Sequence, residues 1–212
     1  MRIGHYIKAL VGAVFPGMLL MRGNTREQQI AITFDDGPHP THTSQILDIL
    51  DQAGARATFF LQGSLAAQYP QLAQSIHARG HLIGNHGFDH HAPSSLGSAA
   101  YVQDALRTQK ILQTIVGVEL PKLFRPPYGS ISLSVFLKLV LHRFRFIFWT
   151  FDSRDSFILD SSALQTHVER SLVKPGDVLL FHEDYAHTLA ALPAILDSLT
   201  KRGFRFVTVQ NM

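Results

Sequence analysis

Short apolar runs alternate with helical patterns along the chain from Gln29 onward. The runs rich in β-branched and aromatic residues, which predict strands, are Ile30–Phe34, Ala57–Leu61, Leu82–Gly84, Lys122–Phe124, Phe146–Phe151, Val178–Phe181 and Phe204–Val209. The stretches between them have apolar residues at helical spacing and predict helices near 46–50, 65–76, 101–116, 135–141, 164–172 and 189–199. Strand–helix alternation over a whole chain is typical of a parallel α/β sheet. About seven such units predict a single domain with a distorted TIM-like barrel.

The first 25 residues differ from this pattern. Arg2 and Lys8 precede an apolar stretch from Ala9 to Met21, which Pro16-Gly17 interrupts. The stretch is shorter than a membrane-spanning helix requires, and it resembles a weak signal peptide or signal anchor. An amphipathic helix that packs on the domain or lies on a membrane surface fits equally well. We therefore expect a separate helical or targeting segment before a domain over residues 26–212.

Composition excludes several classes of function. Hydrophobic residues make up 46% of the 212 and charged residues 17%, which supports a sizeable core and argues against disorder. The chain has no cysteine, so disulfides, cysteine-ligated zinc and a thiol nucleophile are excluded. The formal net charge of +3 is compatible with an anionic polymer or a membrane surface. Nucleic-acid binding ranks last, because the sequence has no stripe of Lys and Arg interleaved with aromatic residues.

Residues that carry chemistry follow the ends of five predicted strands. They are Asp35 and Asp36 after the first strand, His86 and His90 after the third, Arg125 after the fourth, Asp152 and Asp155 after the fifth, and His182 after the sixth. In a parallel barrel the carboxyl ends of the strands lie on one face, and that face carries the catalytic groups. The pattern therefore predicts one active site, because groups without a shared function would be spread over the loops at both ends.

Two neighbouring carboxylates open this series. An apolar run ends in Asp35 and Asp36, and Gly37-Pro38 then predicts a tight turn. Adjacent carboxylates repel each other unless a cation binds or their environments differ. His86 and His90 are spaced i, i+4, which on a helical turn places both imidazoles on one side. Together with Asp36 they predict a two-histidine, one-carboxylate set that suits Zn²⁺, and also Fe²⁺ or Co²⁺.

These motifs occur together in one known family. Asp35-Asp36-Gly-Pro, His86-x-x-x-His90, Arg125-Pro-Pro-Tyr-Gly, Asp152-x-x-Asp155 and Leu179-Leu180-Phe181-His182 resemble the motifs of the polysaccharide deacetylases, the NodB-homology domains of carbohydrate esterase family 4. The resemblance runs from about Gln29 to the C-terminus. It implies a distorted (β/α)7 barrel and a metal-dependent hydrolase. The implied substrate is an N- or O-acetylated carbohydrate such as a chitin oligosaccharide, peptidoglycan, an exopolysaccharide or a glycolipid.

The resemblance also implies which residues bind the metal and activate water. Asp36, His86 and His90 would hold the ion, usually zinc, which acts as a Lewis acid and lowers the pKa of a water molecule. Asp35 would be the general base that takes a proton from the attacking water. Arg125 would orient Asp35 and keep it ionised.

Four further residues are assigned by the same resemblance. His182 would be the general acid that protonates the leaving amine. Asp155 would hold His182 in the right tautomer and raise its pKa. The backbone N–H at Tyr128 would help to stabilise the oxyanion. Leu180 would line the small pocket for the acetyl methyl group.

The chain departs from the family pattern at three positions. Gly87 stands where the family usually has Ser or Thr, Ser156 where it usually has Trp, and Glu183 where it often has Asp. The Trp forms one wall of the acetate pocket. Ser156 therefore predicts a wider or more polar pocket, or an aromatic wall from elsewhere, with Phe151 and Phe157 near in sequence. The metal-binding and proton-transfer residues are intact, so the departures concern substrate choice.

Two other functions stay open at this point. Relatives of the fold open cyclic amides, and a pocket widened at Ser156 would favour such a substrate. A non-catalytic carbohydrate-binding or envelope protein would have lost a metal ligand or Asp35, and neither is lost. The expected partner is an acetylated carbohydrate and not a nucleic acid, with residues 1–25 as a candidate contact with a membrane surface. A cell-envelope or membrane-associated location is favoured over a cytoplasmic one, and the sequence leaves the oligomeric state open.

Overall fold

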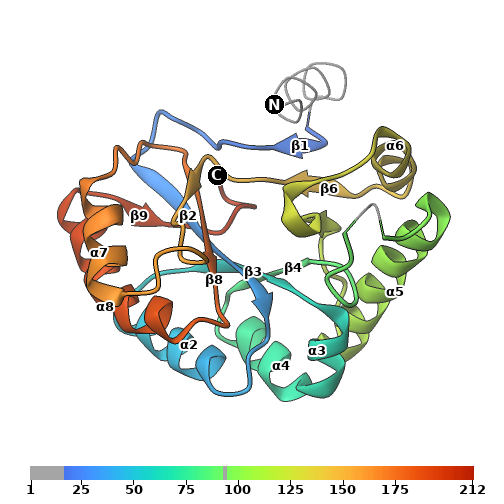
Figure 1. Cartoon of the computed structure of the whole chain (residues 1–212), viewed down its shortest axis with the longest axis horizontal. Coiled ribbons are helices and arrows are strands. Elements are labelled where there is room, and N and C mark those ends of the chain that lie inside the picture. Colours follow the sequence, from blue (N-terminus) through green and yellow to red (C-terminus); the bar gives the residue numbers. More distant parts are fainter. Residues whose placement is uncertain (1–16, 93–94) are drawn as a thin grey trace.

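The computed structural model describes residues 17–92 and 95–212. Its strands are β1 (Leu19–Leu20), β2 (Gln29–Gly37), β3 (Ala57–Leu61), β4 (Leu82–Asn85), β5 (Leu123–Phe124), β6 (Arg145–Ile147), β7 (Phe151–Asp152), β8 (Val178–His182) and β9 (Arg205–Phe206). They form one curled sheet in the order β1-β6-β5-β4-β3-β2-β8-β7, and β9 pairs with β2 (Figure 1). Each ladder between these strands is parallel. The predicted α/β fold with an imperfectly closed barrel is confirmed.

Helices cover the outer side of this sheet (Figure 1). They are α2 (His42–Gln52), α3 (Gly63–Gln68), α4 (Pro70–Ala78), α5 (Ser98–Val116), α6 (Leu133–Leu141), α7 (Ser161–Arg170) and α8 (Ala186–Lys201), with a short 3₁₀ helix, η1 (Pro127–Gly129). The helical pattern over 65–76 corresponds to two helices, because Tyr69 leaves the helical conformation and Pro70 begins α4. Proline disfavours the helical conformation of the residue before it and is well tolerated at the first position of a helix.

The run predicted as one strand, Phe146–Phe151, forms two strands with different neighbours. β6 pairs with β1 and β5, whereas β7 pairs with β8 at the other end of the sheet. The residues between them bridge the gap. The N–H of Phe148 donates to the carbonyl of Leu20, and the N–H of Thr150 donates to the carbonyl of Val178. A run of apolar residues indicates that a segment is buried but not which strand it pairs with. The sequence therefore did not predict that β6 and β7 have different neighbours.

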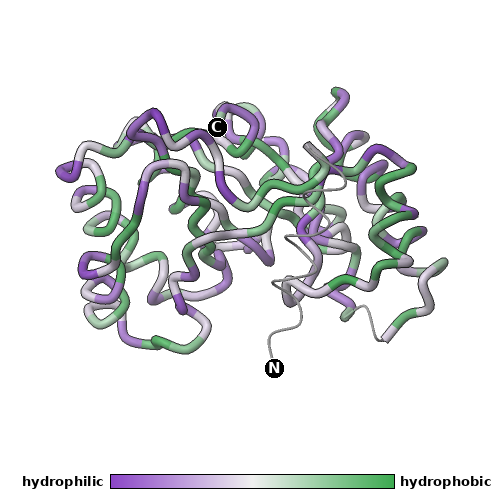
Figure 2. The backbone as a smooth tube through the Cα atoms, turned by 90° about the horizontal axis from the view of Figure 1, so that it is seen from above, coloured by the Kyte–Doolittle hydropathy of each residue, from purple (hydrophilic) through white to green (hydrophobic). Residues whose placement is uncertain are grey.

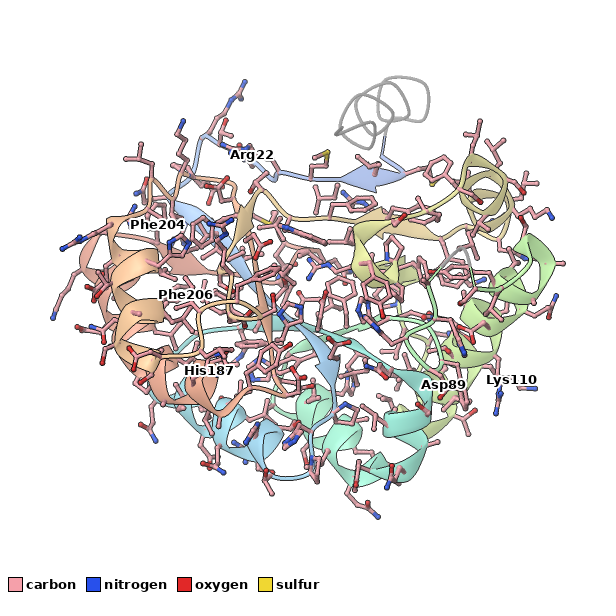
Figure 3. All side chains as sticks on the ribbon, in the orientation of Figure 1. Arg22, Asp89, Lys110, His187, Phe204 and Phe206 are labelled. Atoms are coloured by element: carbon pink, nitrogen blue, oxygen red, sulfur yellow. The ribbon has the colours of Figure 1, made fainter. Side chains whose placement is uncertain are left out.

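The first described residues belong to the sheet. Leu19 and Leu20 of β1 pair with Phe146 and Ile147 of β6. Arg22, which follows β1 along the upper edge in Figure 3, forms an ion pair with Asp177 at 2.5 Å. The helix expected over residues 1–25 therefore does not extend over β1. Residues 1–16, which hold most of that predicted segment, lie outside the described part of the chain.

Alternation along the strands separates an outer core from an inner face. On β2, Ile30, Ile32 and Phe34 belong to the large apolar cluster under the helices, and the ring of Phe34 stacks on that of Phe59 at 5.1 Å. The residues between them, Ala31 and Thr33, point to the inside of the curled sheet, since successive strand side chains alternate. Figure 2 shows the apolar strands running through the middle of the molecule. The inward-facing series of β2 continues to Asp35, near the carboxyl end of the strand.

Candidate active site

The end of β2 turns two adjacent carboxylates toward one site. Asp35 continues the inward-facing series of Thr33. Simple alternation would send Asp36 outward, but its backbone is left-handed (φ 68°) and the pairing of β2 with β3 is irregular between Phe34 and Gly37. A bulge of this kind redirects a side chain. Both Asp side chains therefore face the same neighbours.

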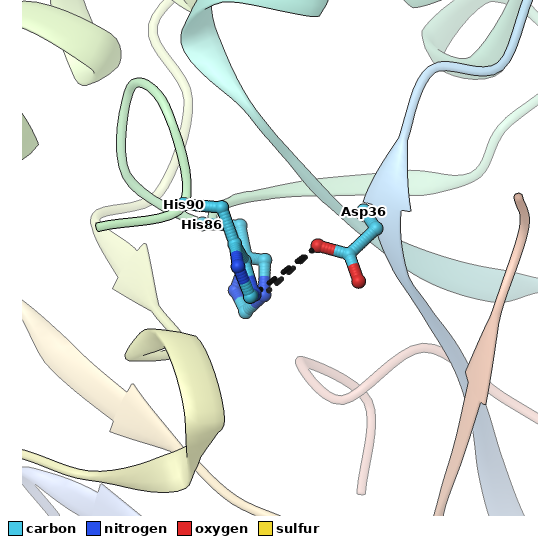
Figure 4. Close-up of side chains that lie close together, drawn as sticks. All are labelled: Asp36, His86 and His90. Carbon is cyan, nitrogen blue, oxygen red and sulfur yellow. Dashed lines mark ion pairs between the residues drawn. The ribbon is translucent and has the colours of Figure 1, made fainter. Parts of the chain in front are cut away.

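Asp36, His86 and His90 come together as a candidate metal centre (Figure 4). One ligand atom from each lies within 4.8 Å of the others. Oδ1 of Asp36 is 3.6 Å from Nε2 of His86 and 3.3 Å from Nε2 of His90. Nδ1 of His86 lies 2.7 Å from the carbonyl oxygen of Arg125. Because a carbonyl only accepts, Nδ1 carries the proton and Nε2 keeps a lone pair for an ion.

The second histidine has the electrostatics of a ligand. Burial lowers the pKa of His90, and this effect outweighs the opposing charge of Asp36. The imidazole is therefore neutral near pH 7, as metal binding requires. The amide of Gln62 donates to Oδ1 of Asp36 at 2.9 Å, which holds the carboxylate toward the two rings. Sequence reasoning did not identify Gln62, which has no motif signal.

The two histidines do not lie on a helical turn, so that part of the spacing argument is wrong. His86 directly follows β4, and the residues up to His90 form an irregular loop. Gly87 (φ 80°) and His90 (φ 53°) both have left-handed backbone, and the two ring centroids are 5.1 Å apart. The convergence results from these two backbone reversals instead of helical periodicity.

Side chains from outside the motif brace this loop. Oδ1 of Asn85 accepts the N–H of Gly87 at 2.9 Å, and Oδ2 of Asp104 accepts the N–H of Phe88 at 2.8 Å. A Cβ at Gly87 would lie 3.2 Å from the Asp104 carboxylate. Asn85 and Asp104 thus hold the loop at Gly87, the position where the family usually has Ser or Thr. Asp104 lies on α5, too far along the chain for the motif to reveal it.

Asp35 is held by a fully buried arginine. Nη1 of Arg125 donates to Oδ1 of Asp35 at 2.8 Å and to the hydroxyl of Thr33 at 2.7 Å. Its Nε donates to the carbonyl of Ile147, and its guanidinium lies over the ring of Phe60. Burial lowers the pKa of Arg125 and the Asp35 charge opposes this, so the pair is mutually dependent. Removing one partner of such a pair costs about 3–5 kcal/mol.

His182 and Asp155 form the second buried pair. Nδ1 of His182 lies 2.8 Å from Oδ1 of Asp155, and the backbone N–H of His182 donates to Oδ2 at 2.7 Å. Burial alone lowers the pKa of His182. The hydrogen bond and charge of Asp155 outweigh burial, Asp35 and Asp36 add to them, and the pKa rises to about 9. The imidazole therefore carries a proton at neutral pH, in line with the predicted rise in its pKa.

Asp155 is itself fixed by α8. The hydroxyl of Thr188 donates to Oδ2 of Asp155 at 3.0 Å, and Nε2 of His187 lies 2.7 Å from its backbone carbonyl. Neither Thr188 nor His187 was expected from the sequence. Asp152, the other acid of that motif, is exposed and accepts the N–H of Arg154. The structure thus brings Asp155, and not Asp152, to His182.

Two further predicted residues lie beside these groups. Tyr128 in η1 has a left-handed backbone (φ 57°) and an exposed side chain, and its ring meets that of His90 edge-on at 4.6 Å. Leu180 is buried on β8, two residues before His182 and therefore on the same side of the strand. Tyr128 therefore lies beside His90, and Leu180 lies on the same side of β8 as His182.

The aromatic ring recorded beside His182 comes from Tyr185 and not from the sequence neighbours of Ser156. Phe151 stacks on His167, and Phe157 is exposed to solvent. The ring of Tyr185 instead lies 5.7 Å from the ring of His182. Tyr185 follows His182 by three residues, a spacing that carried no signal in the sequence.

Glu183 is a buried carboxyl group behind the candidate metal centre. It is fully buried, and Oε2 accepts the hydroxyl of Thr43 at 2.8 Å. Burial raises its pKa to about 8, with Asp184, Asp36 and Asp35 adding to the effect, so it is uncharged at neutral pH. A Cβ at Gly37 would lie 1.0 Å from Oε1 of Glu183. Gly37 is therefore needed for this close approach, while the left-handed φ in this turn belongs to Asp36.

A pocket of about 370 Å³ opens beside the candidate metal centre. Its lining comprises Asp36, Pro38, His39, Pro40, Gln62, Leu65, Tyr69, His90 and Asp184. A larger hollow of about 560 Å³ lies on α7, lined by residues such as Ser162, Thr166 and Arg170. That hollow contains none of the predicted site residues. The smaller pocket is the one connected to the chemistry.

A family model and several individual proteins match this chain. The family model of the polysaccharide deacetylases matches residues 22–147. A peptidoglycan-N-acetylglucosamine deacetylase of Bacillus cereus is 39% identical over 191 residues, which cover 88% of each chain. A chitooligosaccharide deacetylase of Azorhizobium caulinodans is 32% identical over 194 residues, which cover 84% of this chain and 91% of the relative.

Solved structures agree with these relatives. A peptidoglycan N-acetylglucosamine deacetylase in complex with 4-naphthalen-1-yl-N-oxidanyl-benzamide superimposes with a TM-score of 0.87 at 32% identity, covering 95% of both chains. A family 4 carbohydrate esterase from Streptomyces lividans in complex with acetate gives a TM-score of 0.77 at 34% identity. That match covers 84% of this chain and 91% of the other.

Proposed function

Because this chain belongs to the polysaccharide deacetylase family, we propose that it removes acetyl groups from the amino sugars of a cell-envelope glycan, with peptidoglycan as the first candidate. The observation that carries the proposal is the convergence of Asp36, His86 and His90 on one side of Asp35, with His182 on the adjacent strand. Relatives named for peptidoglycan and for chitooligosaccharides support an acetylated carbohydrate as the substrate class.

We assign Asp36, His86 and His90 as ligands of a divalent metal ion. These three residues fit a metal ion, because both imidazoles present Nε2 toward one carboxylate oxygen. Two hydrogen bonds orient these ligand groups: Nδ1 of His86 donates to a backbone carbonyl, and Oδ1 of Asp36 accepts from an amide. Two nitrogen ligands and one oxygen ligand suit Zn²⁺ best, with Co²⁺ and Fe²⁺ as alternatives. A bound ion would supply Lewis-acid polarisation of the acetyl carbonyl and a lower pKa for water.

The proton transfers follow from the two buried pairs. Asp35 accepts a proton from the attacking water, while Arg125, which also donates to the Thr33 hydroxyl, keeps the Asp35 carboxylate pointing inward. His182 has Nδ1 engaged by Asp155, so Nε2 is the atom that donates to the leaving amine. Because Asp155 and the neighbouring carboxylates raise the pKa of His182 to about 9, the donor is charged when the substrate binds.

Substrate contacts complete the proposed mechanism. The backbone N–H of Tyr128 stabilises the oxyanion, and Leu180 lines the pocket for the acetyl methyl group. We assign the aromatic wall to Tyr185, whose ring lies 5.7 Å from that of His182. This assignment weakens the case for a cyclic-amide substrate, which depended on an open pocket at Ser156. The intact metal and proton-transfer residues argue against a non-catalytic protein.

The proposed location is the cell envelope, where peptidoglycan deacetylases act. Within residues 17–92 and 95–212, no helix is long and apolar enough to cross a membrane. The expectation that residues 1–25 contact a membrane surface stays a proposal, and its first 16 residues lie outside the described part. The domain proposed over residues 26–212 contains all the assigned site residues.

The test is acetate release from peptidoglycan, N-acetylglucosamine oligomers and simple acetyl esters. Protein freed of metal by a chelator is assayed before and after Zn²⁺, Co²⁺ or Fe²⁺ is added back. Acetate that appears only with metal, and not with Asp35→Asn, supports the proposal and ranks the substrates. A lack of acetate from every substrate despite stoichiometric bound metal would contradict the deacetylase assignment. A failure to bind any of the three ions would contradict the ligand assignment.

A further inference from the structure

Helix α6 is apolar on its outer face as well as toward the core. Seven of the nine residues in its sequence, LSVFLKLVL, are apolar. Leu133, Leu137 and Leu141 are 58%, 40% and 83% exposed, whereas the side chains that face the sheet are buried. Positions i, i+4 and i+8 lie close together along one side of a helix. The three leucines therefore form one solvent-facing stripe, which we call the α6 stripe.

The segments of the chain that form β1, β6 and α6 carry no acidic residue. Sixteen acidic residues occur in the whole sequence, but none lies between Glu119 and Asp152, and none precedes Glu27. The two stretches meet where β1 pairs with β6, beside α6 (Figure 1). Lys138 and Arg143 are exposed on α6 and just after it. The surface of α6 thus combines three exposed leucines with two exposed cations.

We propose that α6 docks on an anionic phospholipid bilayer, with the α6 stripe inserted at the boundary between headgroups and acyl chains. Lys138 and Arg143 would contact the lipid phosphates. A helix that is apolar on both faces, with basic side chains at the edge of its exposed stripe, has the pattern of an interfacial helix. Long basic side chains can rest their stems on apolar surface while their charges reach phosphate.

The position of α6 connects this surface to the active site. α6 begins four residues after η1, and η1 carries the exposed Tyr128 beside His90. Docking through the α6 stripe would hold this edge of the site near the bilayer. Acetylated glycans close to the membrane would then be favoured over those farther out. This inference goes beyond the deacetylase reaction and does not depend on it.

A single-cysteine probe tests the contact directly, because the chain has no cysteine of its own. Leu137→Cys in the full chain is labelled with an environment-sensitive fluorophore. Leu172→Cys is the matched control, since Leu172 is 85% exposed and follows α7, which lies across the molecule from α6 (Figure 1). The probe at 137 should shift to shorter wavelength with vesicles of equal parts phosphatidylcholine and phosphatidylglycerol. Phosphatidylcholine vesicles alone should give a much smaller shift, and high salt should reduce the larger one.

Vesicle co-sedimentation gives the second measurement. Leu137→Ser combined with Leu141→Ser should lower the partition coefficient at least about tenfold, because two apolar side chains no longer leave water. Lys138→Glu should weaken binding to the anionic vesicles. Leu172→Ser and Lys174→Glu, on the far side of the molecule, should leave binding to the vesicles unchanged. Acetate release from a soluble N-acetylglucosamine oligomer should be the same in all four, since none of these residues touches the site.

Three results would overturn the proposal. The first is an unshifted probe at 137 in the presence of anionic vesicles to which the protein binds, which would assign binding to another segment such as residues 1–25. The second is a probe at 137 already shielded in dilute protein without vesicles, which would mean that part of the same chain covers the stripe. The third is a shift that grows with protein concentration without vesicles, which would identify a second copy as the occupant.

Discussion

The proposed metal-binding side and the proposed proton-transfer side of this site are held in different ways. On the proton-transfer side, Asp35 and Asp155 are buried, and each has close hydrogen bonds to a positively charged or protonated partner. On the metal side, Asp36 and His90 are partly exposed and lie on left-handed backbone. Their ligand atoms face one another at 3.3 Å.

The difference follows from what each side needs before substrate arrives. Proton-transfer groups must already have the right charge, so their partners are built into the protein and buried with them. Ligand groups need only a suitable arrangement, because an ion supplies the remaining attraction. His86 joins the two sides, since Arg125 holds it through its backbone carbonyl and holds Asp35 through its side chain.

The largest effect should come from removing a ligand. His86→Ala should abolish stoichiometric metal binding and with it metal-dependent acetate release. The cost to folding should be only about 1–3 kcal/mol, mainly because the carbonyl of Arg125 loses its hydrogen-bond donor. Metal analysis of dialysed protein and thermal unfolding measure the two effects. His77→Ala, on the exposed face of α4, is the control, and equal metal content in the two variants would remove His86 from the ligand set.

The next largest effect should separate turnover from metal binding. Asp35→Asn should retain metal and lower kcat about 10²–10⁴-fold, because the base is lost while Arg125 keeps a hydrogen-bond acceptor. Acetate release at saturating substrate and metal analysis on the same sample provide the measurement. Turnover near that of the unmodified protein would assign the base to another group.

A smaller effect should be a shift in pH dependence. In the proposed mechanism His182 acts in its protonated form, and Asp155 with its neighbours raises its pKa to about 9, so activity should be present below that pH and fall as pH rises through it. A bound cation repels the proton, which places this limb at or below pH 9 in the metal-loaded protein. Asp155→Asn removes the main stabilising charge and should move the limb to lower pH. An unmoved alkaline limb in a kcat–pH profile would contradict the pairing.

The smallest effect should appear behind the metal side, at Glu183. Burial raises its pKa to about 8 from an ordinary 4.5, so the unfolded chain loses this proton at lower pH than the folded chain. The stability of the protein should therefore fall relative to Glu183→Gln as pH rises from about 4.5 to 8. Thermal unfolding of both proteins across this range measures the difference. A constant difference in Tm would mean that Glu183 is charged in the folded state.

Local patterns in the chain account for much of the fold. The strand prediction for Ala57–Leu61 matches β3 residue for residue, and that for Ile30–Phe34 lies inside β2. Short-range patterns failed where the partner changed along one apolar run, as at Phe146–Phe151. They also failed between His86 and His90, whose i, i+4 spacing predicts a helical turn but whose segment has left-handed backbone instead. In both cases the local signal was present, but the conformation depended on distant residues.

The sequence by itself determined which chemical groups reach the site and in what order, because strand ends in a parallel barrel share one face. It therefore pointed to Asp35, Asp36, His86, His90 and His182 before any coordinates. Only the tertiary structure decided how each group is held and charged. Arg125 and Asp35 are 90 positions apart, and Glu183 and Thr43 are 140 apart. Burial and pairing across such separations set the protonation states, and no local pattern in a chain records them.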